Sequence, residues 1–420
     1  MGADSVIYIR ADGNTEIATG HLVRCLSIAR ALKKELQDTG MIVTGSGSSP
    51  ITFLVSDQES KALLNGFFDC REEFPVRILE TARYDDLEAE LPELTSLIIN
   101  RCQTSHCYTP ASDGASYPVS NAPFSSLNKP VLLVDSYFVT ENYFLSLKTH
   151  ATLVYLDDLR SFDYPVDLVI NYDILTPEAY REYEHSYTFA RKRLLGGAYA
   201  PLRPQFQSAS RALPSVSEGK ICHVLIASGG SDPYHTTLHL TQYLLAECPP
   251  GYCFHLLLGS MNPDRQALCE LADRQNLCAC ASPSAKASTV ILHQSVSDMA
   301  SLMQSCDLAL SAAGTTLYEL CAVGVPTASF IIADNQIASA NAFAQNDAIP
   351  CLGDIRTNEE SIKKEAAHWV TSMNPYVKNQ AASARLLRYQ NVSKRMQQLV
   401  DGNGAIRIAD ALLALLKSHS

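Results

Sequence analysis

Residues 5–24 read SVIYIRADGNTEIATGHLVR, and this stretch predicts the structural unit from which the rest of the chain is built. Residues 6–9 form a short apolar strand, a polar loop with a glycine follows, and a helix is expected to begin near Gly20. A strand, a loop and a helix in this order are typical of α/β domains with a parallel sheet. No basic segment precedes the strand, so we expect no signal peptide.

The same alternation recurs along most of the chain. Apolar, β-rich segments predict strands at 6–9, 52–55, 96–99, 131–134 and 152–156 in the first half, and at 224–226, 254–258, 290–293, 308–310 and 327–331 in the second. Helical periodicity predicts helices at 22–36, 236–247 and 317–323, among others. We therefore expect an α/β protein of two Rossmann-like, doubly wound domains. Ligands of such sheets bind beyond the carboxyl ends of the strands, so we expect a cleft between the two domains.

Composition places the domain boundaries. Residues 201–220 contain three prolines with Ser and Gln between them, which is typical of a linker. We expect an N-terminal domain at 1–205, a linker at 206–220, a C-terminal domain at 221–400 and a terminal helical segment at 401–420. The Ser/Pro/Asn-rich stretch 104–129 predicts an insertion in the N-terminal domain.

The overall composition excludes several classes of protein. Of the 420 residues, 46% are hydrophobic, which is enough to bury two cores and excludes a disordered chain. No apolar run reaches the roughly 18 residues that a membrane helix needs. The net charge of −11 argues against nonspecific nucleic-acid binding, which requires a basic surface. We expect a cytoplasmic protein without a membrane or nucleic-acid partner, whose oligomeric state, monomer included, the sequence leaves open.

The 13 cysteines do not predict a metal site or a disulfide framework. Most lie inside apolar runs, where cysteine behaves as a small hydrophobic residue. The pairs Cys278 with Cys280 and Cys102 with Cys107 lack a second ligand pair at the spacing of zinc sites. We therefore expect neither a metal nor another cofactor.

His21 is the first candidate for chemistry, because it lies in the first turn of the helix that follows the first strand. The positive end of the helix dipole disfavours an imidazolium there, so His21 is expected to be neutral near pH 7. A neutral imidazole in a cleft can act as a general base. The alternative is a histidine that caps the helix and has no chemical role.

A second candidate segment is ASGGSDP (residues 227–233), between a predicted strand and a predicted helix. The paired glycines Gly229 and Gly230 let backbone N–H groups approach an anion closely, and Pro233 suits the first turn of a helix. The segment lacks the lysine of a Walker motif and is not GxGxxG. It therefore predicts either a phosphate-binding loop or a simple tight turn.

A third candidate segment is SAAGTTLYE (residues 311–319), which again joins a strand to a helix. The helix N-terminus after Gly314 and Thr315 offers a second anion site, and Glu319 lies about one turn inside the helix. A carboxylate there can accept both hydroxyls of a ribose, or it can simply face solvent. Asn335 and Gln336 follow the next strand and are expected at the same edge of the sheet.

Carboxylates and a tyrosine end two strands of the first domain. Asp135 and Tyr137 follow one strand, and Asp158 follows the next. At this edge they can bind sugar hydroxyls or orient His21, although carboxylates at strand ends also commonly cap the following turn.

Taken in chain order, these motifs resemble those of a known family. They are RAD (10–12), IATGHLVRCLSIA (17–29), VDSY (134–137), LDD (156–158), INY (170–172), GGAYAPLR (196–203), SGGSD (228–232), AGTTLYE (313–319) and DNQ (334–336). They resemble the hydrolase of pseudaminic acid biosynthesis that cleaves UDP-2,4-diacetamido-2,4,6-trideoxy-β-L-altropyranose. The resemblance implies the GT-B fold, in which two Rossmann-like domains flank the active site.

The resemblance also implies roles for individual residues. His21 takes the position of the catalytic histidine. The family's cleft tyrosine falls on Tyr137, and its nucleotide-binding positions fall on Gly229, Gly230, Glu319, Asn335 and Gln336. From the motifs themselves we further expect contacts to the UDP-sugar from Arg10, Asp12, Gly20, Asp158, Ser231, Gly314 and Thr315. Ala18 is a departure, because the family usually has a glycine there.

These observations lead to one hypothesis and two alternatives. In the hypothesis, His21 removes a proton from a water that attacks the anomeric carbon with inversion, and backbone dipoles stabilise the departing UDP without a metal. The first alternative is a GT-B glycosyltransferase that moves the sugar to an acceptor hydroxyl. The second is a nucleotide-sugar sensor without catalysis. The substituents and stereochemistry of the sugar do not follow from the sequence.

Overall fold

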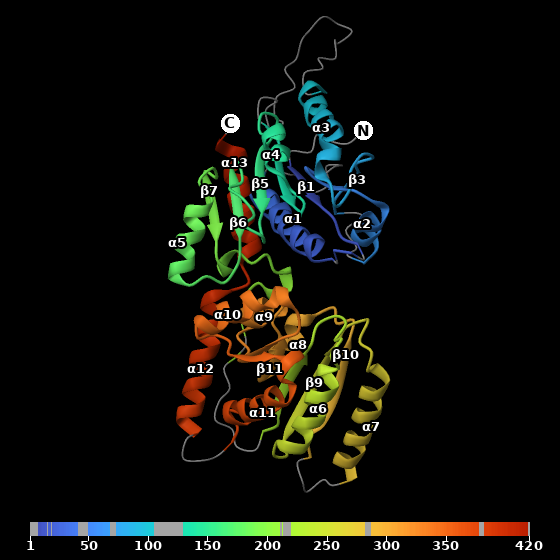
Figure 1. Ribbon diagram of the computed structural model, residues 1–420, viewed down its shortest axis with the longest axis vertical. Helices are drawn as coiled ribbons and strands as arrows, with labels where there is room; N and C mark the ends of the chain where they lie inside the picture. The colour runs from blue at the N-terminus through green and yellow to red at the C-terminus, as the bar shows by residue number, and fades with distance from the viewer. Residues whose placement is uncertain are drawn as a thin grey trace, which may run out of the picture. The chain divides into compact units, whose positions relative to one another are not determined.

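The chain folds into two compact units. A computed structural model describes residues 7–14, 16–17, 19–40, 49–67, 73–104, 129–210, 212, 220–281, 287–377 and 382–418. Unit 1 comprises Met1–Asp173, Pro177–Pro204 and Gly404–Ser420, and unit 2 comprises Ile174–Thr176 and Gln205–Asn403. Each unit has its own parallel sheet (Figure 1). The cleft expected between the domains stays a prediction.

Unit 1 is built on a sheet with the strand order β3-β2-β1-β4-β5-β6-β7. Its strands are β1 (Ile7–Ala11), β2 (Ile51–Val55), β3 (Val76–Ile78), β4 (Val131–Asp135), β5 (Thr152–Leu156), β6 (Leu168–Asn171) and β7 (Lys192–Leu195). Its helices are α1 (Gly20–Asp38), α2 (Gln58–Ala62), α3 (Leu91–Thr104), α4 (Glu141–Leu147), α5 (Pro177–Ser186) and α13 (Gly404–Ser418), with short helical segments η1 (Leu63–Phe67), η2 (Leu87–Glu90) and η3 (Gly197–Tyr199).

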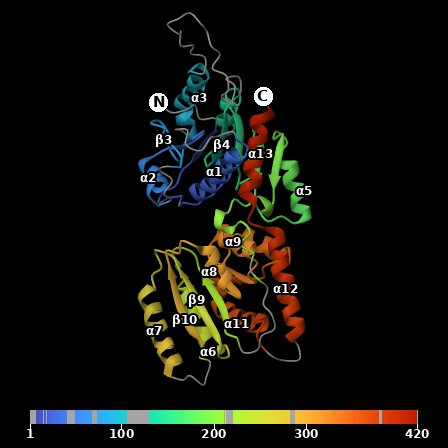
Figure 2. The ribbon, with the colours of Figure 1, turned by 180° about the vertical axis from the view of Figure 1, so that it is seen from behind.

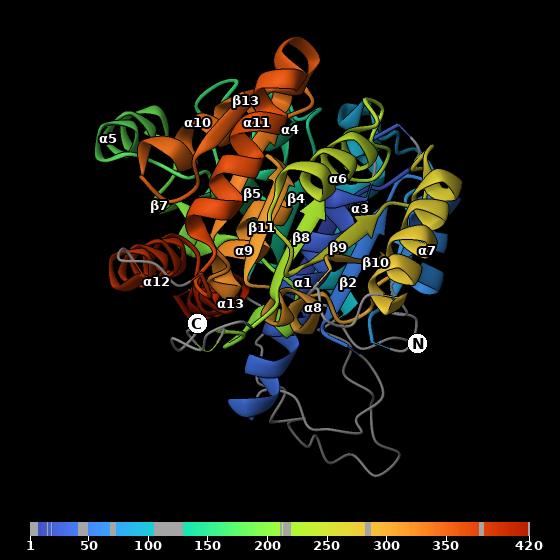
Figure 3. The same ribbon diagram turned by 90° about the horizontal axis from the view of Figure 1, so that it is seen from below.

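Unit 2 repeats the plan with the strand order β10-β9-β8-β11-β12-β13. Its strands are β8 (Cys222–Ala227), β9 (Tyr252–Leu258), β10 (Thr289–Gln294), β11 (Leu308–Ala312), β12 (Thr327–Ile331) and β13 (Cys351–Asp354). Its helices are α6 (Thr236–Glu247), α7 (Arg265–Ala281), α8 (Met299–Ser305), α9 (Thr316–Val323), α10 (Ile337–Gln345), α11 (Ile355–Met373) and α12 (Ala382–Leu399), with η5 (Asp334–Gln336) before α10. Helices lie on both faces of this sheet (Figure 3). Among the described residues, no helix has the length and apolar character needed to cross a bilayer.

Both sheets reverse their strand order at one point, and this position determines where ligands can bind. In unit 1 the reversal falls between β1 and β4, and in unit 2 between β8 and β11. In doubly wound sheets, ligands bind beyond the carboxyl ends of the strands at such a point. The predicted doubly wound architecture is thus confirmed in each unit.

The last helix of the chain belongs to unit 1. Helix α13 packs against α1 and buries Ile408, Leu412 and Leu416 in the core of that unit (Figure 2). A Cβ atom at Gly404 would lie 2.2 Å from the carbonyl oxygen of Ala200, so only glycine allows the helix to begin this close to the backbone. The sequence predicts this helix but not the domain on which it packs.

Several local expectations were wrong or incomplete. Residues 96–99 lie in α3, where Leu94 and Ile98 are buried four residues apart, as a helix requires. The short strands β3, β6, β7 and β13 were not predicted. Helix α6 has the predicted bounds, but Pro233, which was expected in the first turn of the helix, lies before its start. The insertion at 104–129 (from 105 to 128), Ala18 and most of the linker at 206–220 (211 and 213–219) lie outside the described residues.

Candidate functional site

His21 lies at the carboxyl edge of the sheet of unit 1, where the strand order reverses. It is the second residue of α1, which follows β1, and only 3% of its surface is exposed. Strand β4 pairs with β1 so that Asp135 lies opposite Ala11, at the carboxyl end of both strands. The first helix and the fourth strand therefore bring a histidine and a carboxylate from distant parts of the sequence to one place.

The Nδ1 atom of His21 lies 2.5 Å from Oδ1 of Asp135. Burial alone would raise the pKa of Asp135, but the Arg24 guanidinium and the His21 ring hold it well below its usual range. An ionised carboxylate can only accept a hydrogen bond, so Nδ1 carries the proton. In the neutral ring, the lone pair available for accepting a proton is then on Nε2.

Arg24 connects this pair to the neighbouring strands. Its Nε donates to Oδ2 of Asp135 at 2.6 Å, and its Nη1 donates to Oδ2 of Asp158 and to the Tyr172 hydroxyl, both at 2.7 Å. The Arg24 side chain is 12% exposed. One cation thus holds two carboxylates in fixed positions, and the carboxylate that orients His21 cannot rotate freely.

Tyr137 forms the outer wall beside the histidine. Its ring meets the His21 ring edge-on, with centroids 4.5 Å apart, while 43% of the tyrosine is exposed. Burial and the Asp158 carboxylate raise the pKa of Tyr137, so its hydroxyl stays protonated at neutral pH. Its protonated hydroxyl can donate a hydrogen bond, and the substrate contact predicted for Tyr137 stays a prediction.

Arg10 and Asp12 occupy positions that differ from the expected one. Arg10 is fully buried in β1, where Nε lies 2.7 Å from the Glu90 carboxylate and Nη1 lies 2.5 Å from that of Asp12. Asp12 also accepts the backbone N–H of Ser56. These contacts hold the loop after β1, and the substrate contacts predicted for Arg10 and Asp12 stay a prediction. Gly20 begins α1, and a Cβ there would meet nothing within 4 Å.

In unit 2, the loop after β8 presents its backbone to solvent. Gly229 has a φ of +83°, which favours glycine, and Gly229, Gly230 and Ser231 are all exposed. Asp232 is buried and accepts the N–H groups of Thr236 and Thr237 at the start of α6. Because a carboxylate already caps this helix, any anion at the loop must bind the amides of residues 229–231 and not the helix end.

The loops after β11 and β12 lie beside the first loop. A Cβ on Gly314 would lie 3.9 Å from Nε2 of Gln336, whose Oε1 accepts the backbone N–H of Ile332 at 3.0 Å. A Cβ on Gly229 would lie 3.9 Å from Cδ1 of the same Ile332. Strands β8, β11 and β12 are neighbours in the sheet, so the three predicted segments of unit 2 meet at its carboxyl edge.

The remaining predicted residues surround these loops. Thr315 precedes α9 and is exposed, and Glu319 is half-buried in the first turn of that helix. Asn335 is exposed on η5. Hydroxyl, carboxylate and amide groups thus accompany the backbone donors of the loop at 229–231. The set has the chemistry needed to bind a phosphate and a sugar hydroxyl.

The sequence did not identify all of the site. Arg24 was noticed only as part of a motif, although its place one helical turn after His21 puts both on one face of α1. Tyr172 was likewise quoted only as part of a motif and was not identified as a member of the site. Gly259, at the end of β9, was also missed: a Cβ there would lie 2.0 Å from the carbonyl oxygen of Gly230, so its lack of a side chain allows the exposed loop its position.

Sequence comparisons find distant relatives. No family model matches the chain. It is 27% identical over 229 residues to the spore coat polysaccharide biosynthesis protein SpsG of Bacillus subtilis, a match of 53% of this chain and 59% of that protein. It is 22% identical over 327 residues to an uncharacterized protein of Methanocaldococcus jannaschii, a match of 76% of this chain and 54% of that protein. The chain thus matches only a little over half the length of each.

Solved structures show the fold. MurG of Acinetobacter baumannii superposes with a TM-score of 0.58 at 13% identity, over 97% of this chain and 99% of that one. UGT89C1 of Arabidopsis thaliana, in complex with UDP-L-rhamnose, gives 0.53 at 13% identity over 98% of each chain. The calicheamicin glycosyltransferase CalG4 gives 0.50 at 15% identity over 99% of each. The chain therefore has the two-domain α/β architecture of GT-B glycosyltransferases.

Proposed function

We propose that this chain is a glycosyltransferase that uses a UDP-sugar as donor and His21 as general base. The observation that carries the proposal is the pairing of His21 with an ionised, buried Asp135 that Arg24 holds in place. The likeness in fold to glycosyltransferases and the relationship to a protein named for polysaccharide biosynthesis support it. The UDP-L-rhamnose in the UGT89C1 structure supports the choice of donor.

The unit 1 cluster suits a displacement at an anomeric carbon. An acceptor hydroxyl donates its proton to Nε2 of His21 as its oxygen forms a bond to the anomeric carbon. The bond from that carbon to the phosphate oxygen breaks, and UDP leaves with the electron pair. The positive charge that develops on the imidazole is stabilised by Asp135, which lies 2.5 Å from Nδ1.

The loops of unit 2 suit the nucleotide. The amides of residues 229–231 would donate hydrogen bonds to the pyrophosphate. The backbone dipoles, and not a metal ion, would then balance its negative charge. Glu319 would accept the ribose hydroxyls, and Gln336 would contribute its Nε2 amide beside Gly314. The same loops would serve any UDP-sugar, so the sugar is selected elsewhere.

A second candidate is hydrolysis, in which water replaces the acceptor hydroxyl. One observation favours it: His21 is only 3% exposed and Tyr137 covers one side of its ring, so a small nucleophile reaches it more easily than a large one. The motif around His21 also resembles that of the hydrolase of pseudaminic acid biosynthesis. The donor for this candidate is UDP-2,4-diacetamido-2,4,6-trideoxy-β-L-altropyranose, and the product is a free sugar with inverted anomeric configuration.

An NMR time course distinguishes the two candidates. The full-length protein is incubated in EDTA with UDP-N-acetylglucosamine, UDP-glucose, UDP-L-rhamnose or the diacetamido sugar, with and without oligosaccharide acceptors. UDP release that requires an acceptor and yields a longer glycan supports transfer, and UDP with free sugar in water alone supports hydrolysis. Intact donors under every condition, together with no binding of UDP, would overturn both.

Matched histidine variants link the activity to the site. We expect His21→Gln to lower the rate of UDP release by at least about 10²-fold while leaving UDP binding in place, because His21 acts on the attacking nucleophile and not on the nucleotide. His185→Gln, an exposed histidine on α5, is expected to behave like the wild type.

A further inference from the structure

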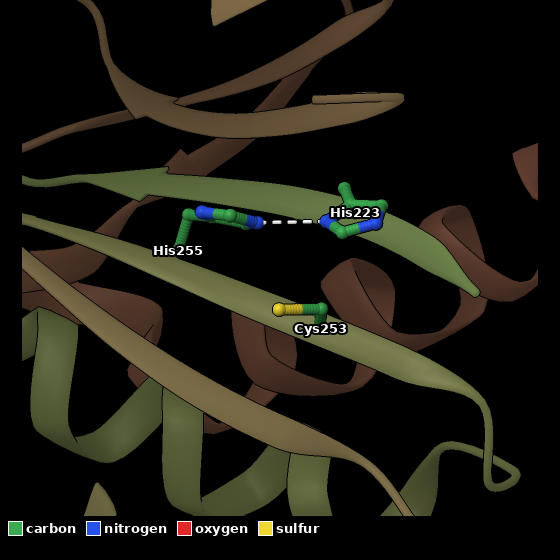
Figure 4. Close-up of side chains that lie close together, drawn as sticks. All are labelled: His223, Cys253 and His255. Atoms are coloured by element: carbon green, nitrogen blue, oxygen red, sulfur yellow. Dashed lines mark hydrogen bonds between the residues drawn. The ribbon is translucent and has the colours of Figure 1, made fainter. Parts of the chain in front are cut away.

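A cluster of metal-ligating side chains lies on the sheet of unit 2, away from the loops described above. His223 on β8 lies opposite Cys253 on β9 in the parallel register, and His255 is two residues further along β9. Side chains two residues apart on a strand point to the same face, so all three lie together (Figure 4). Their ligand atoms all lie within 4.8 Å of one another.

We propose that His223, Cys253 and His255 form a binding site for a thiophilic d10 metal ion, with Zn²⁺ as the expected occupant. Two imidazoles and one thiolate are a ligand set typical of zinc, and a tetrahedral ion keeps its fourth position for water or another group. Soft sulfur ligation excludes Mg²⁺ and Ca²⁺, which prefer oxygen.

The geometry needs only small adjustments to hold the ion. Nδ1 of His223 lies 2.8 Å from Nε2 of His255, whereas two nitrogens on one tetrahedral zinc are separated by roughly 3.3 Å. A rotation of each ring accounts for the difference of about half an ångström. The Cys253 sulfur lies within 4.8 Å of both ring nitrogens, and its single side-chain torsion gives it freedom to adjust.

A third histidine, on the neighbouring strand β10, contacts the second ring nitrogen of His255. Nδ1 of His255 lies 2.9 Å from Nε2 of His293 on β10, so the ring can donate its Nδ1 proton to His293 while Nε2 faces the ion. Zinc-bound histidines commonly have such a partner on their second nitrogen, which fixes the ring and its tautomer.

Binding of the metal ion is expected to release a single proton from the three ligands. The hydrogen that His223 and His255 share moves to the outer nitrogen of its own ring, so no proton leaves the imidazoles. Zinc is bound by the thiolate form of cysteine, so binding of the ion moves the thiol proton of Cys253 to solvent. Binding of one Zn²⁺ therefore releases about one proton near pH 7.

The position in the fold argues for a structural role. His223 and Cys253 are each the second residue of their strand, at the amino edge of the sheet. The glycine loop follows β8 at the carboxyl edge, some four residues or about 13 Å further along the strand. Occupancy should therefore raise the melting temperature of unit 2 and leave UDP affinity unchanged.

Cobalt(II) is a suitable optical probe for the full-length protein under reducing conditions. We expect one equivalent to produce the absorption of a thiolate-to-cobalt charge transfer. Cys253→Ala should abolish that band, and His293→Ala should weaken binding by about 10-fold. The exposed cysteines of α7 give the matched control, and Cys278→Ala with Cys280→Ala should retain the band. A band that persists in Cys253→Ala, or disappears in the control, would overturn the proposal.

X-ray absorption on the zinc-loaded wild type tests the ligand set without relying on the folding of a variant. The proposal requires one sulfur at about 2.3 Å and two nitrogens at about 2.0–2.1 Å. A shell without sulfur, or with two or more sulfurs, would contradict it.

Discussion

The two candidate sites of this molecule are built in opposite ways. In unit 1, the candidate groups are side chains buried among charges: His21, Asp135 and Arg24 are joined by hydrogen bonds of 2.5–2.6 Å. In unit 2, the candidate groups are largely exposed, and the loop after β8 offers backbone amides from two glycines and a serine. The same strand order thus supports a preorganised charge cluster in one unit and an open backbone cradle in the other.

This difference indicates which of the two candidate sites suits a general base and which suits a nucleotide. A general base must have a fixed tautomer and a fixed direction, and a buried ion network provides both at the expense of desolvating charges. A nucleotide must enter and leave, so exposed amides that need no rearrangement suit it better. The predictions below therefore place large stability effects in unit 1 and affinity effects in unit 2.

The largest effect is expected for Asp135→Asn. The variant leaves the buried Arg24 with only Asp158 as its carboxylate partner, and we expect unfolding in urea to show a loss of about 3–5 kcal/mol. The pKa of Asp135 is lowered in the folded state, so its stabilising contribution is full above the unfolded value of about 3.9 and declines as the pH falls further. The difference between wild type and variant should therefore shrink below about pH 4.

Asp158→Asn is the matched control. The side chain of Asp158 is 24% exposed, whereas that of Asp135 is fully buried. Asp158→Asn should therefore lower the free energy of unfolding clearly less than Asp135→Asn does. Equal losses for the two variants would show that the network has no centre at Asp135.

Gly259→Ala should give the largest effect in unit 2. The added Cβ would lie 2.0 Å from the carbonyl oxygen of Gly230, so the exposed loop must move. We expect a loss of about 1–3 kcal/mol in stability and a weaker affinity for UDP by calorimetry. In Gly230→Ala the added methyl meets nothing within 4 Å, so stability should stay within about 0.5–1 kcal/mol of the wild type. If Gly259→Ala binds UDP as the wild type does, the loop at 229–231 is not the nucleotide site.

Glu319→Ala should mainly affect binding. A charge-assisted hydrogen bond to ribose is worth about 1.5–3 kcal/mol, so KM for the UDP-sugar should rise by about 10-fold or more while kcat changes little. Glu365→Ala, an exposed glutamate on α11, provides the comparison. An unchanged KM in steady-state kinetics would remove Glu319 from the ribose site.

The smallest effect is expected for Tyr137→Phe. The edge-on contact with His21 remains, and only the hydroxyl is lost, so kcat should fall by a few-fold at most. Tyr137→Ala also removes the ring and should lower kcat further. Equal kinetics for the two variants would show that the ring does not position the histidine.

Much of this organisation was accessible from the sequence, because it is local. The strand, loop and helix around His21 are continuous in the chain, and so are the loops at Gly229 and Gly314. Their meeting at the carboxyl edges follows from the order of parallel strands. The fold class and the positions of these segments were therefore predictable.

What could not be predicted depends on contacts between distant residues. Asp135 lies 114 positions from His21, and the sequence could not decide whether it orients the histidine or caps a turn. Arg10 looked like a polar residue at a crevice, yet it pairs with Glu90, which lies 80 positions away. The cluster of His223, Cys253 and His255 depends on the register between two strands, which no spacing motif records.

The most direct test of the central proposal measures binding and turnover in the same variant. For His21→Ala, calorimetry should give the wild-type Kd for UDP, because the loops proposed to bind the nucleotide belong to unit 2 and His21 belongs to unit 1. With the UDP-sugar that the wild type turns over, kcat should fall by at least about 10²-fold, the usual contribution of a general base. A kcat near that of the wild type, with UDP still bound, would contradict the role of His21 as the base.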